Sequence, residues 1–181
     1  FHALWRIFMR KVDRAPTMPC TLGDLLYSKK PLTVGAESTN VCNADCSFCG
    51  YGKGEDGKAA DPRTKTTVDI DVHRHTLRLY SEAGGGTYIL SPILGEISAD
   101  KRWLDLIREA RSYPNIIGVG CFTNAILLDR FGSEAILTSG LTSISISTAL
   151  GSPEQYRRLY GVDKYETVVE NTIDLLETNE R

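Results

Sequence analysis

Long apolar runs, a charge excess and repeated segments are all scarce or missing in this sequence of 181 residues. No apolar run reaches the roughly 18 residues that a membrane-spanning helix requires. The 21 Lys and Arg residues nearly balance the 23 Asp and Glu residues, so the formal net charge is only −2. The sequence therefore predicts no membrane span. It also predicts no nucleic-acid partner, because nucleic-acid binding depends on a basic surface.

Cysteine is uncommon, and its distribution argues against a disulfide framework. There are five cysteines, an odd number, and three of them lie close together at Cys42, Cys46 and Cys49. This spacing favours a metal site in a reducing compartment over a secreted, cross-linked fold. We therefore expect a cytoplasmic protein in which Cys20 and Cys121 are not ligands.

The N-terminal segment is apolar on one side and basic on the other. This pattern over residues 1–11 predicts a short amphipathic helix, which either packs against protein or binds a membrane surface. The chain starts at Phe1 and stops in a charged helical stretch. We therefore expect a fragment with an N-terminal helical extension over residues 1–31.

From residue 34 onward, apolar residues recur in patterns that alternate between strand and helix. Strands are predicted at 34–37, 87–90, 116–122 and 141–148, and helices at 69–83, 100–111, 127–138, 153–160 and 165–177. Such alternation implies a parallel sheet with right-handed crossovers, and four units do not close an eight-unit barrel. The expected fold class is α/β, a partial TIM-like (β/α) barrel whose third strand is covered on both faces.

The segment of residues 39–50 holds the sharpest chemical signal. Its cysteines are separated by three and then by two residues, so one tight loop can point three thiolates at one centre. Three thiolates hold three irons of a [4Fe–4S] cluster and leave the fourth iron open to a small chelating molecule.

Other interpretations of these cysteines stay open. Cys46 and Cys49 alone have the spacing of a thioredoxin-type redox pair, which leaves Cys42 without a role. A structural zinc site needs a fourth ligand, although no candidate has zinc-finger spacing. The candidates for that ligand are Cys20, His73 and His75. A buried, inert trio is the remaining alternative.

The cysteine segment resembles the cluster motif of the radical S-adenosylmethionine (AdoMet) superfamily, because Phe48 precedes the last cysteine and a predicted strand precedes the first. The resemblance implies a [4Fe–4S] cluster on Cys42, Cys46 and Cys49, with AdoMet chelating the fourth iron through its amino and carboxylate groups. It also implies that one electron from the cluster breaks the sulfonium bond, and that the resulting 5′-deoxyadenosyl radical takes hydrogen from a substrate. Phe48 is expected to help pack the adenine.

A second segment is similar to the Gly-Gly-Glu segment of the superfamily. Gly95 and Glu96 match it, whereas Leu94 replaces the first glycine. The resemblance implies that Glu96 accepts a hydrogen bond from the AdoMet ammonium group. The alternative is a carboxylate at the entry of a helix.

Further AdoMet contacts are implied at the ends of the next two strands. Thr123 and Asn124 resemble the family's Thr-Asn-Gly. Ser145 and Ser147 share a strand face with Ser143 and occupy the region of a serine that binds the AdoMet carboxylate or ribose. The alternative for this face is a layer of small residues inside a barrel.

Residues 156–165 and 171–173 are similar to the fourth helical region of SPASM/twitch-type members, which often modify peptides or proteins. The resemblance implies a core domain over 32–181, with two of six βα units beyond Arg181. It also implies an electron donor such as flavodoxin or ferredoxin and an unidentified substrate, for which a peptide or protein is one candidate. No catalytic residue is assigned. Two rival functions stay open, a non-catalytic iron–sulfur protein for electron transfer or structure and a zinc-stabilised binding domain.

Two features are left without a functional assignment. Residues 50–58 are rich in glycine and lysine but lack the order of a phosphate-binding P-loop, so a plain loop is predicted. His73 and His75 fall on a predicted outer helix, where we expect both to face solvent.

Overall fold

The computed structural model describes residues 31–51, 65–91 and 93–181. Contacts divide the chain into two compact units, Phe1–Lys30 and Pro31–Arg181, and every described residue belongs to the second. The predicted helix at residues 1–11 and Cys20 lie outside the described residues, so the N-terminal extension stays a prediction. Within the described part, no helix is both long and apolar enough to cross a membrane.

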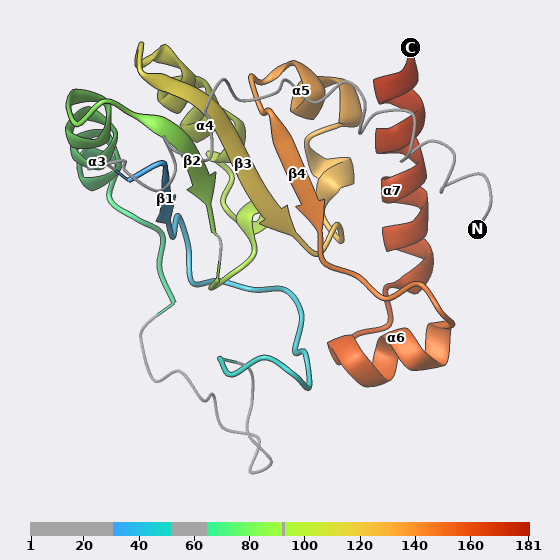
Figure 1. The fold of residues 1–181 in the computed structure, drawn as a ribbon. Coiled ribbons are helices and arrows are strands. Elements are labelled where there is room, and N and C mark those ends of the chain that lie inside the picture. Colours follow the sequence, from blue (N-terminus) through green and yellow to red (C-terminus); the bar gives the residue numbers. More distant parts are fainter. Residues whose placement is uncertain (1–30, 52–64, 92) are drawn as a thin grey trace, which may run out of the picture. The chain divides into compact units, whose positions relative to one another are not determined.

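The strands of the described part form one parallel sheet in the order β1-β2-β3-β4. They are β1 Thr33–Ala36, β2 Gly86–Leu90, β3 Ile116–Thr123 and β4 Ser143–Ile146. The predicted alternation of strands and helices is therefore confirmed, and the fold is α/β. Figure 1 shows the carboxyl ends of the strands at the lower edge of the sheet.

Five α-helices and two 3-10 helices are seen among the described residues. The α-helices are α3 Ile70–Glu82, α4 Trp103–Ser112, α5 Ser133–Thr138, α6 Pro153–Tyr160 and α7 Tyr165–Glu180, and the 3-10 helices are η1 Ile97–Ala99 and η2 Leu128–Arg130. The single helix predicted at 127–138 is in fact divided into η2 and α5. The cause is Gly132, whose φ of 77° is left-handed and ends a regular helix.

Local sequence explains where α3 begins and ends. The carboxylate of Asp69 caps its N-terminus by accepting a 2.7 Å hydrogen bond from the backbone N–H of Asp71. After the helix, Gly85 has a φ of 60°, and a Cβ there would lie 1.9 Å from the carbonyl oxygen of Asn115. Only glycine fits this turn, which returns the chain into β2.

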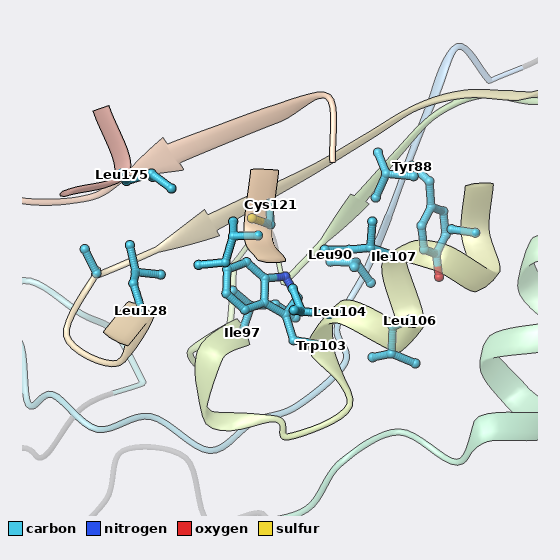
Figure 2. Close-up of a cluster of buried hydrophobic side chains, with 14 of the residues drawn as sticks. Tyr88, Leu90, Ile97, Trp103, Leu104, Leu106, Ile107, Cys121, Leu128 and Leu175 are labelled. Atoms are coloured by element: carbon cyan, nitrogen blue, oxygen red, sulfur yellow. The ribbon is translucent and has the colours of Figure 1, made fainter. Parts of the chain in front are cut away.

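One face of the sheet packs against the helices. The buried strand residues on this face include Tyr88, Leu90, Val119 and Cys121. Figure 2 shows Trp103 of α4 near Ile97 and Cys121, and Trp103 is fully buried. Because burying one large apolar side chain stabilises a fold by about 1.5–3 kcal/mol, this cluster holds the helices to the sheet.

The opposite face of the sheet is more open. Gly120 and Ser143 are paired across it, as are Phe122 and Ser145. The side chain of Phe122 is 45% exposed, and both serines are exposed. The prediction that the third strand is covered on both faces is confirmed at Gly118 and Gly120, which are buried on this face, and wrong at Phe122.

Candidate functional site

Three loops meet at the carboxyl-terminal edge of the sheet, because the parallel strands all end there. The cysteine loop follows β1 and is drawn in blue to cyan in Figure 1. The backbone N–H of Glu96, in the loop after β2, donates a 2.8 Å hydrogen bond to the carbonyl oxygen of Val41. The loop after β2 therefore lies against the residue that precedes Cys42.

Gly95 makes this approach possible. Its φ is 75°, and a Cβ at this position would lie 2.1 Å from the carbonyl oxygen of Thr39. A larger residue would push the two loops apart and strain the backbone. The glycine that resembles part of a Gly-Gly-Glu segment is therefore required by the packing of the two loops.

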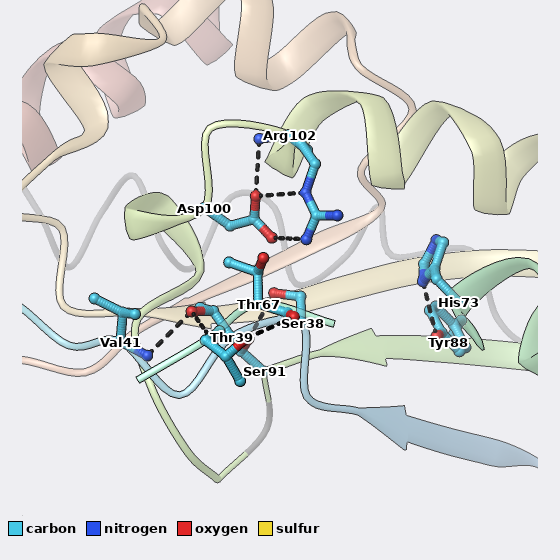
Figure 3. Close-up of polar contacts among 10 residues, drawn as sticks. Ser38, Thr39, Val41, Thr67, His73, Tyr88, Ser91, Asp100 and Arg102 are labelled. Atoms are coloured by element: carbon cyan, nitrogen blue, oxygen red, sulfur yellow. Dashed lines mark hydrogen bonds and ion pairs between the residues drawn. The ribbon is translucent and has the colours of Figure 1, made fainter. Parts of the chain in front are cut away.

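The base of the cysteine loop is tied to a segment beyond it. The backbone N–H of Asn40 donates to the carbonyl oxygen of Thr66 at 3.1 Å, and the N–H of Thr66 donates to Oδ1 of Asn40 at 2.7 Å. Oγ1 of Thr39 accepts a 3.0 Å hydrogen bond from the N–H of Val41 (Figure 3). These contacts fix the chain immediately before Cys42.

Glu96 is the central polar residue of the edge. Its side chain is buried, and Oε1 accepts hydrogen bonds from the N–H of Ser98 at 3.0 Å, from Oγ of Ser98 at 2.6 Å and from Oγ1 of Thr123 at 2.7 Å. Oε2 accepts from the N–H of Asn124 at 2.7 Å. The carboxylate thus caps η1, as the helix-entry alternative predicted, and also binds the end of β3. Because a carboxylate oxygen has two acceptor sites, Oε2 keeps room for one more donor.

The segment after β3 is joined to both the cysteine loop and α7. Nδ2 of Asn124 donates a 2.7 Å hydrogen bond to Oδ1 of Asn43, which lies between the first two cysteines. Ala125 has a left-handed φ of 63°, and its carbonyl oxygen accepts a 2.8 Å hydrogen bond from Nδ2 of Asn171. The segment that resembles Thr-Asn-Gly therefore has a backbone that suits glycine at its third position.

The thiols of the cysteine loop interact electrostatically, and this interaction changes their pKa values. Burial, followed by the charges of Cys42 and Cys49, raises the pKa of the Cys46 thiol to about 11. Burial also raises the pKa of Cys42, and the charges of Glu96 and Cys49 act in the same direction. A positively charged metal centre would oppose these shifts of Cys42 and Cys46, because it favours the thiolate form.

The described residues do not gather a ready-made site for a single metal ion. No group of three or more His, Cys, Asp or Glu side chains among them is placed to hold one ion. The assignment of Cys42, Cys46 and Cys49 as cluster ligands stays a prediction. His73, a candidate zinc ligand, is buried in α3, and its Nδ1 lies 3.3 Å from the hydroxyl of Tyr88 (Figure 3). The prediction that His73 faces solvent is therefore wrong, while His75 is exposed as expected.

The C-terminal end of α6 supports the cysteine loop, a contact that sequence reasoning missed. The N–H of Asp45 donates to the carbonyl oxygen of Tyr160 at 2.9 Å, and the N–H of Ser47 donates to that of Leu159 at 2.8 Å. Gly161 has a φ of 67°, and a Cβ there would lie 2.4 Å from the carbonyl oxygen of Asp45. A glycine directly after a predicted helix was the available signal for this close approach.

The remaining predicted AdoMet contacts lie around this edge. Phe48 is 61% exposed and meets the ring of Tyr160 edge-on at 5.5 Å between centroids. The N–H of Ser147 donates a 2.8 Å hydrogen bond to the carbonyl oxygen of Thr123, while Ser145 lies on the open face of the sheet. The roles of Phe48, Ser145 and Ser147 toward a ligand stay predictions.

Comparison with known proteins gives a family match over most of the chain. A family model described as "Radical SAM superfamily" matches residues 36–179. GTP 3′,8-cyclase of Cronobacter sakazakii is 28% identical over 146 residues, which are 79% of this chain and 42% of that protein. The chain thus spans less than half the length of that relative.

Solved structures share the fold. The structure described as native anSMEcpe with bound AdoMet has a TM-score of 0.65 and 16% identity, and the match covers 83% of this chain and 42% of that one. HydG, described as a maturase of the [FeFe]-hydrogenase, has a TM-score of 0.62 and 13% identity, over 81% of this chain and 32% of its own. At these identities the likeness shows the fold alone.

Proposed function

The chain belongs to the radical SAM superfamily, and we propose on this basis that Cys42, Cys46 and Cys49 hold a [4Fe–4S] cluster to which AdoMet binds. Members of this superfamily are enzymes that use this cluster and this cofactor. When bound, the reduced cluster supplies the electron for reductive cleavage of AdoMet, which leads to hydrogen abstraction from a substrate. The protein's own task is to bind, orient and shield these groups.

The convergence of three loops on Glu96 is the observation that supports this proposal. The carboxylate of Glu96 joins the end of β3 to the loop after β2, and the backbone N–H of Glu96 donates to the carbonyl oxygen of Val41, the residue before Cys42. In our proposal, Oε2 of Glu96 receives the AdoMet ammonium, and Gly95 lets this loop approach the cysteines. Thr123 and Asn124 orient the carboxylate from below.

The other proposed contacts surround this centre. Phe48 packs the adenine, because it is the exposed aromatic ring beside the last cysteine. Ser145 and Ser147 contact the AdoMet carboxylate or ribose from the end of β4. The core domain of the proposal is residues 32–181.

Two substrate classes follow from different observations. The similarity of residues 156–165 to SPASM/twitch-type members favours a peptide or protein. The curated relative from Cronobacter sakazakii is named for GTP, which makes a nucleotide the alternative substrate class. A flavodoxin or ferredoxin is the proposed electron donor.

Anaerobic reconstitution tests the proposal directly. The protein should bind about four irons and four sulfides, and AdoMet should perturb the EPR spectrum of the reduced cluster, because it binds the open iron. Replacing Cys42, Cys46 or Cys49 by Ala should abolish a stable cluster. Cys121→Ala is the matched control, because Cys121 is buried in β3 and should leave the cluster intact.

The rival functions predict different results. Stoichiometric zinc without sulfide would indicate a zinc-stabilised binding domain. A stable cluster whose EPR spectrum ignores AdoMet would indicate an electron-transfer or structural iron–sulfur protein. Formation of 5′-deoxyadenosine under dithionite would separate the enzyme from both.

A further inference from the structure

Both neighbours of Cys42 are tied to the same residue, Glu96. Before Cys42, the carbonyl oxygen of Val41 accepts a 2.8 Å hydrogen bond from the backbone N–H of Glu96. After Cys42, Oδ1 of Asn43 accepts a 2.7 Å hydrogen bond from Nδ2 of Asn124. The backbone N–H of Asn124 in turn donates to Oε2 of Glu96 at 2.7 Å. Cys42 is therefore held on both sides relative to the carboxylate of Glu96.

The hydrogen bonds fix the orientation of both amide groups. Oδ1 of Asn124 accepts a 3.1 Å hydrogen bond from the backbone N–H of Ile126, so its Nδ2 must face Asn43. Asn43 then presents its oxygen to Asn124, and its own Nδ2 is buried without a hydrogen-bond partner among the described residues. A buried, unpaired donor costs stability, which offsets what the bond to Asn124 contributes. This balance favours a role for Asn43 beyond holding the fold together.

The proposed function requires a fixed separation between the cysteine loop and Glu96. In that function, one AdoMet molecule binds the carboxylate of Glu96 and also the iron that the three cysteines leave open. A small molecule can reach both groups only if the two loops keep one distance. The tolerance is narrow, since a misplacement of about 1 Å in a catalytic site can cost about a hundredfold in rate.

We propose that Asn43 is a positioning residue, which sets the distance between Cys42 and the carboxylate of Glu96. It acts through Asn124, and the distance lets one AdoMet molecule reach both the open iron and Glu96. This inference rests on the proposed function, because it requires the cluster and AdoMet. Asn43 itself neither ligates the cluster nor contacts AdoMet in this assignment. Its loss should therefore leave a cluster that forms normally but binds AdoMet weakly.

A double-mutant cycle of Asn43→Ala and Asn124→Ala in the cluster-loaded protein tests the assignment, with the AdoMet affinity measured by isothermal titration. Each variant removes the same bond between the two amides, and Asn124→Ala keeps the backbone N–H that binds Glu96. Each should lower the affinity by about fivefold to tenfold. The double variant should bind no more weakly than the weaker single variant. A loss in the double variant that equals the product of the two single losses would overturn the assignment, because the residues would then act independently.

Asn115→Ala is the matched control. Nδ2 of Asn115 donates a 2.9 Å hydrogen bond to the carbonyl oxygen of Ser81, and Asn115 precedes β3, at the opposite end of that strand from Asn124. This variant also loses one asparagine hydrogen bond, so it should lower stability without changing the affinity for AdoMet. An equal fall in affinity in Asn115→Ala would overturn the assignment, since the effect would then follow from a general loss of stability.

EPR spectroscopy adds a readout that a purely structural role would not move. Without AdoMet, the reduced clusters of Asn43→Ala and of the wild-type protein should give the same spectrum. With saturating AdoMet, the two spectra should differ, because AdoMet meets the open iron in a changed geometry. Spectra that already differ without AdoMet would overturn the assignment, since Asn43 would then act on the cluster itself.

The outcomes separate this inference from the proposed function. If the wild-type protein forms no cluster, or if its cluster ignores AdoMet, the proposed function fails and the inference fails with it. If the wild-type protein binds AdoMet and Asn43→Ala binds it equally well, only the assignment of Asn43 is overturned.

A measurement on the wild-type protein covers the case in which Asn43→Ala does not fold. In NMR spectra of the apo protein, the Nδ2 protons of Asn124 should exchange slowly with solvent, because this residue is buried and bonded to Asn43. Fast exchange of these protons would contradict the hydrogen bond on which the assignment depends.

Discussion

The hydroxyl of Thr123 donates a 2.7 Å hydrogen bond to the carboxylate of Glu96, which links the last residue of β3 to the loop after β2. Both side chains are buried, so the bond is made in a medium of low polarity where it is strong. The group proposed to bind AdoMet therefore also holds the sheet edge together. Changes at Glu96 should affect both stability and ligand binding.

Glu96→Gln should lower the free energy of unfolding by about 2–4 kcal/mol without any ligand. Oε2 accepts the N–H of Asn124, and an amide group placed at this position would face that donor with another donor. Urea denaturation of the apo protein measures the change. Glu82→Gln is the control, because Glu82 is exposed and pairs with Arg78 on the surface, so it should cost no more than about 0.5 kcal/mol.

The same substitution separates the two roles of Glu96. If the carboxylate also binds the AdoMet ammonium, the affinity of the cluster-loaded Glu96→Gln protein should fall about tenfold or more. Isothermal titration at a temperature where the variant is fully folded measures this affinity. An unchanged affinity in a destabilised variant would leave Glu96 with a structural role alone.

His73 should make the stability depend on pH. Burial lowers its pKa below 6.5 in the folded protein, while Glu109 opposes this shift and Arg102 and Arg74 add to it. The unfolded state therefore binds more protons below pH 6.5. Stability should be fully present above that pH and should fall as the pH drops, by at most about 1.4 kcal/mol per pH unit.

Denaturation curves between pH 5 and pH 8 check this dependence. His73→Leu should remove the slope that His73 contributes, whereas His75→Gln should keep it, because His75 is exposed. A slope that is identical in His73→Leu and in the wild-type protein would show that other groups cause it.

The sequence was sufficient to predict the order of the strands and helices. The predicted strands fall on β1 to β4, because apolar runs mark β2 and β3 and the alternation of Ser with Ile marks β4. Apolar residue type does not mark the buried face of α3, because Val72 and Leu79 are 56% and 48% exposed. The buried stripe instead runs through His73 and Leu77, and a polar residue type concealed it.

The supporting contacts of the site could not be predicted from the sequence. The pairing of Asn43 with Asn124 joins residues 81 positions apart, and no local pattern specifies it. The same holds for the contact of Asp45 with Tyr160, which depends on how α6 turns back toward the loop. Such contacts arise from the arrangement of whole elements rather than from periodicity.

Asp100→Ala should destabilise the fold by about 2–3 kcal/mol. Asp100 is buried and accepts two hydrogen bonds from the guanidinium of Arg102, at 3.0 and 2.8 Å, and one from its backbone N–H at 3.0 Å (Figure 3). These charge-assisted bonds fix the start of α4 and the position of Trp103. Asp105→Ala is the control, because the 2.6 Å pair of Asp105 with Arg108 is exposed and should contribute at most about 0.5 kcal/mol. Equal losses in the two variants, measured by urea denaturation, would contradict a special role of Asp100.

Ala125→Gly should cost much less stability than Ala110→Gly, although both alanines are fully buried. Ala125 is held at a φ of 63°, where an L-residue with a Cβ is strained by about 1–2 kcal/mol and glycine is not. This relief should offset the lost methyl group and the greater freedom of glycine in the unfolded chain, so the net change should be near zero. Ala110 lies inside α4, where glycine removes a good helix former and a buried methyl group at a cost of about 2 kcal/mol.

Thermal and urea unfolding of the two variants measure the difference, which should be at least about 1 kcal/mol. Equal costs would mean that the hydrogen bond from Asn171 to the carbonyl oxygen of Ala125 does not hold the backbone in a strained state.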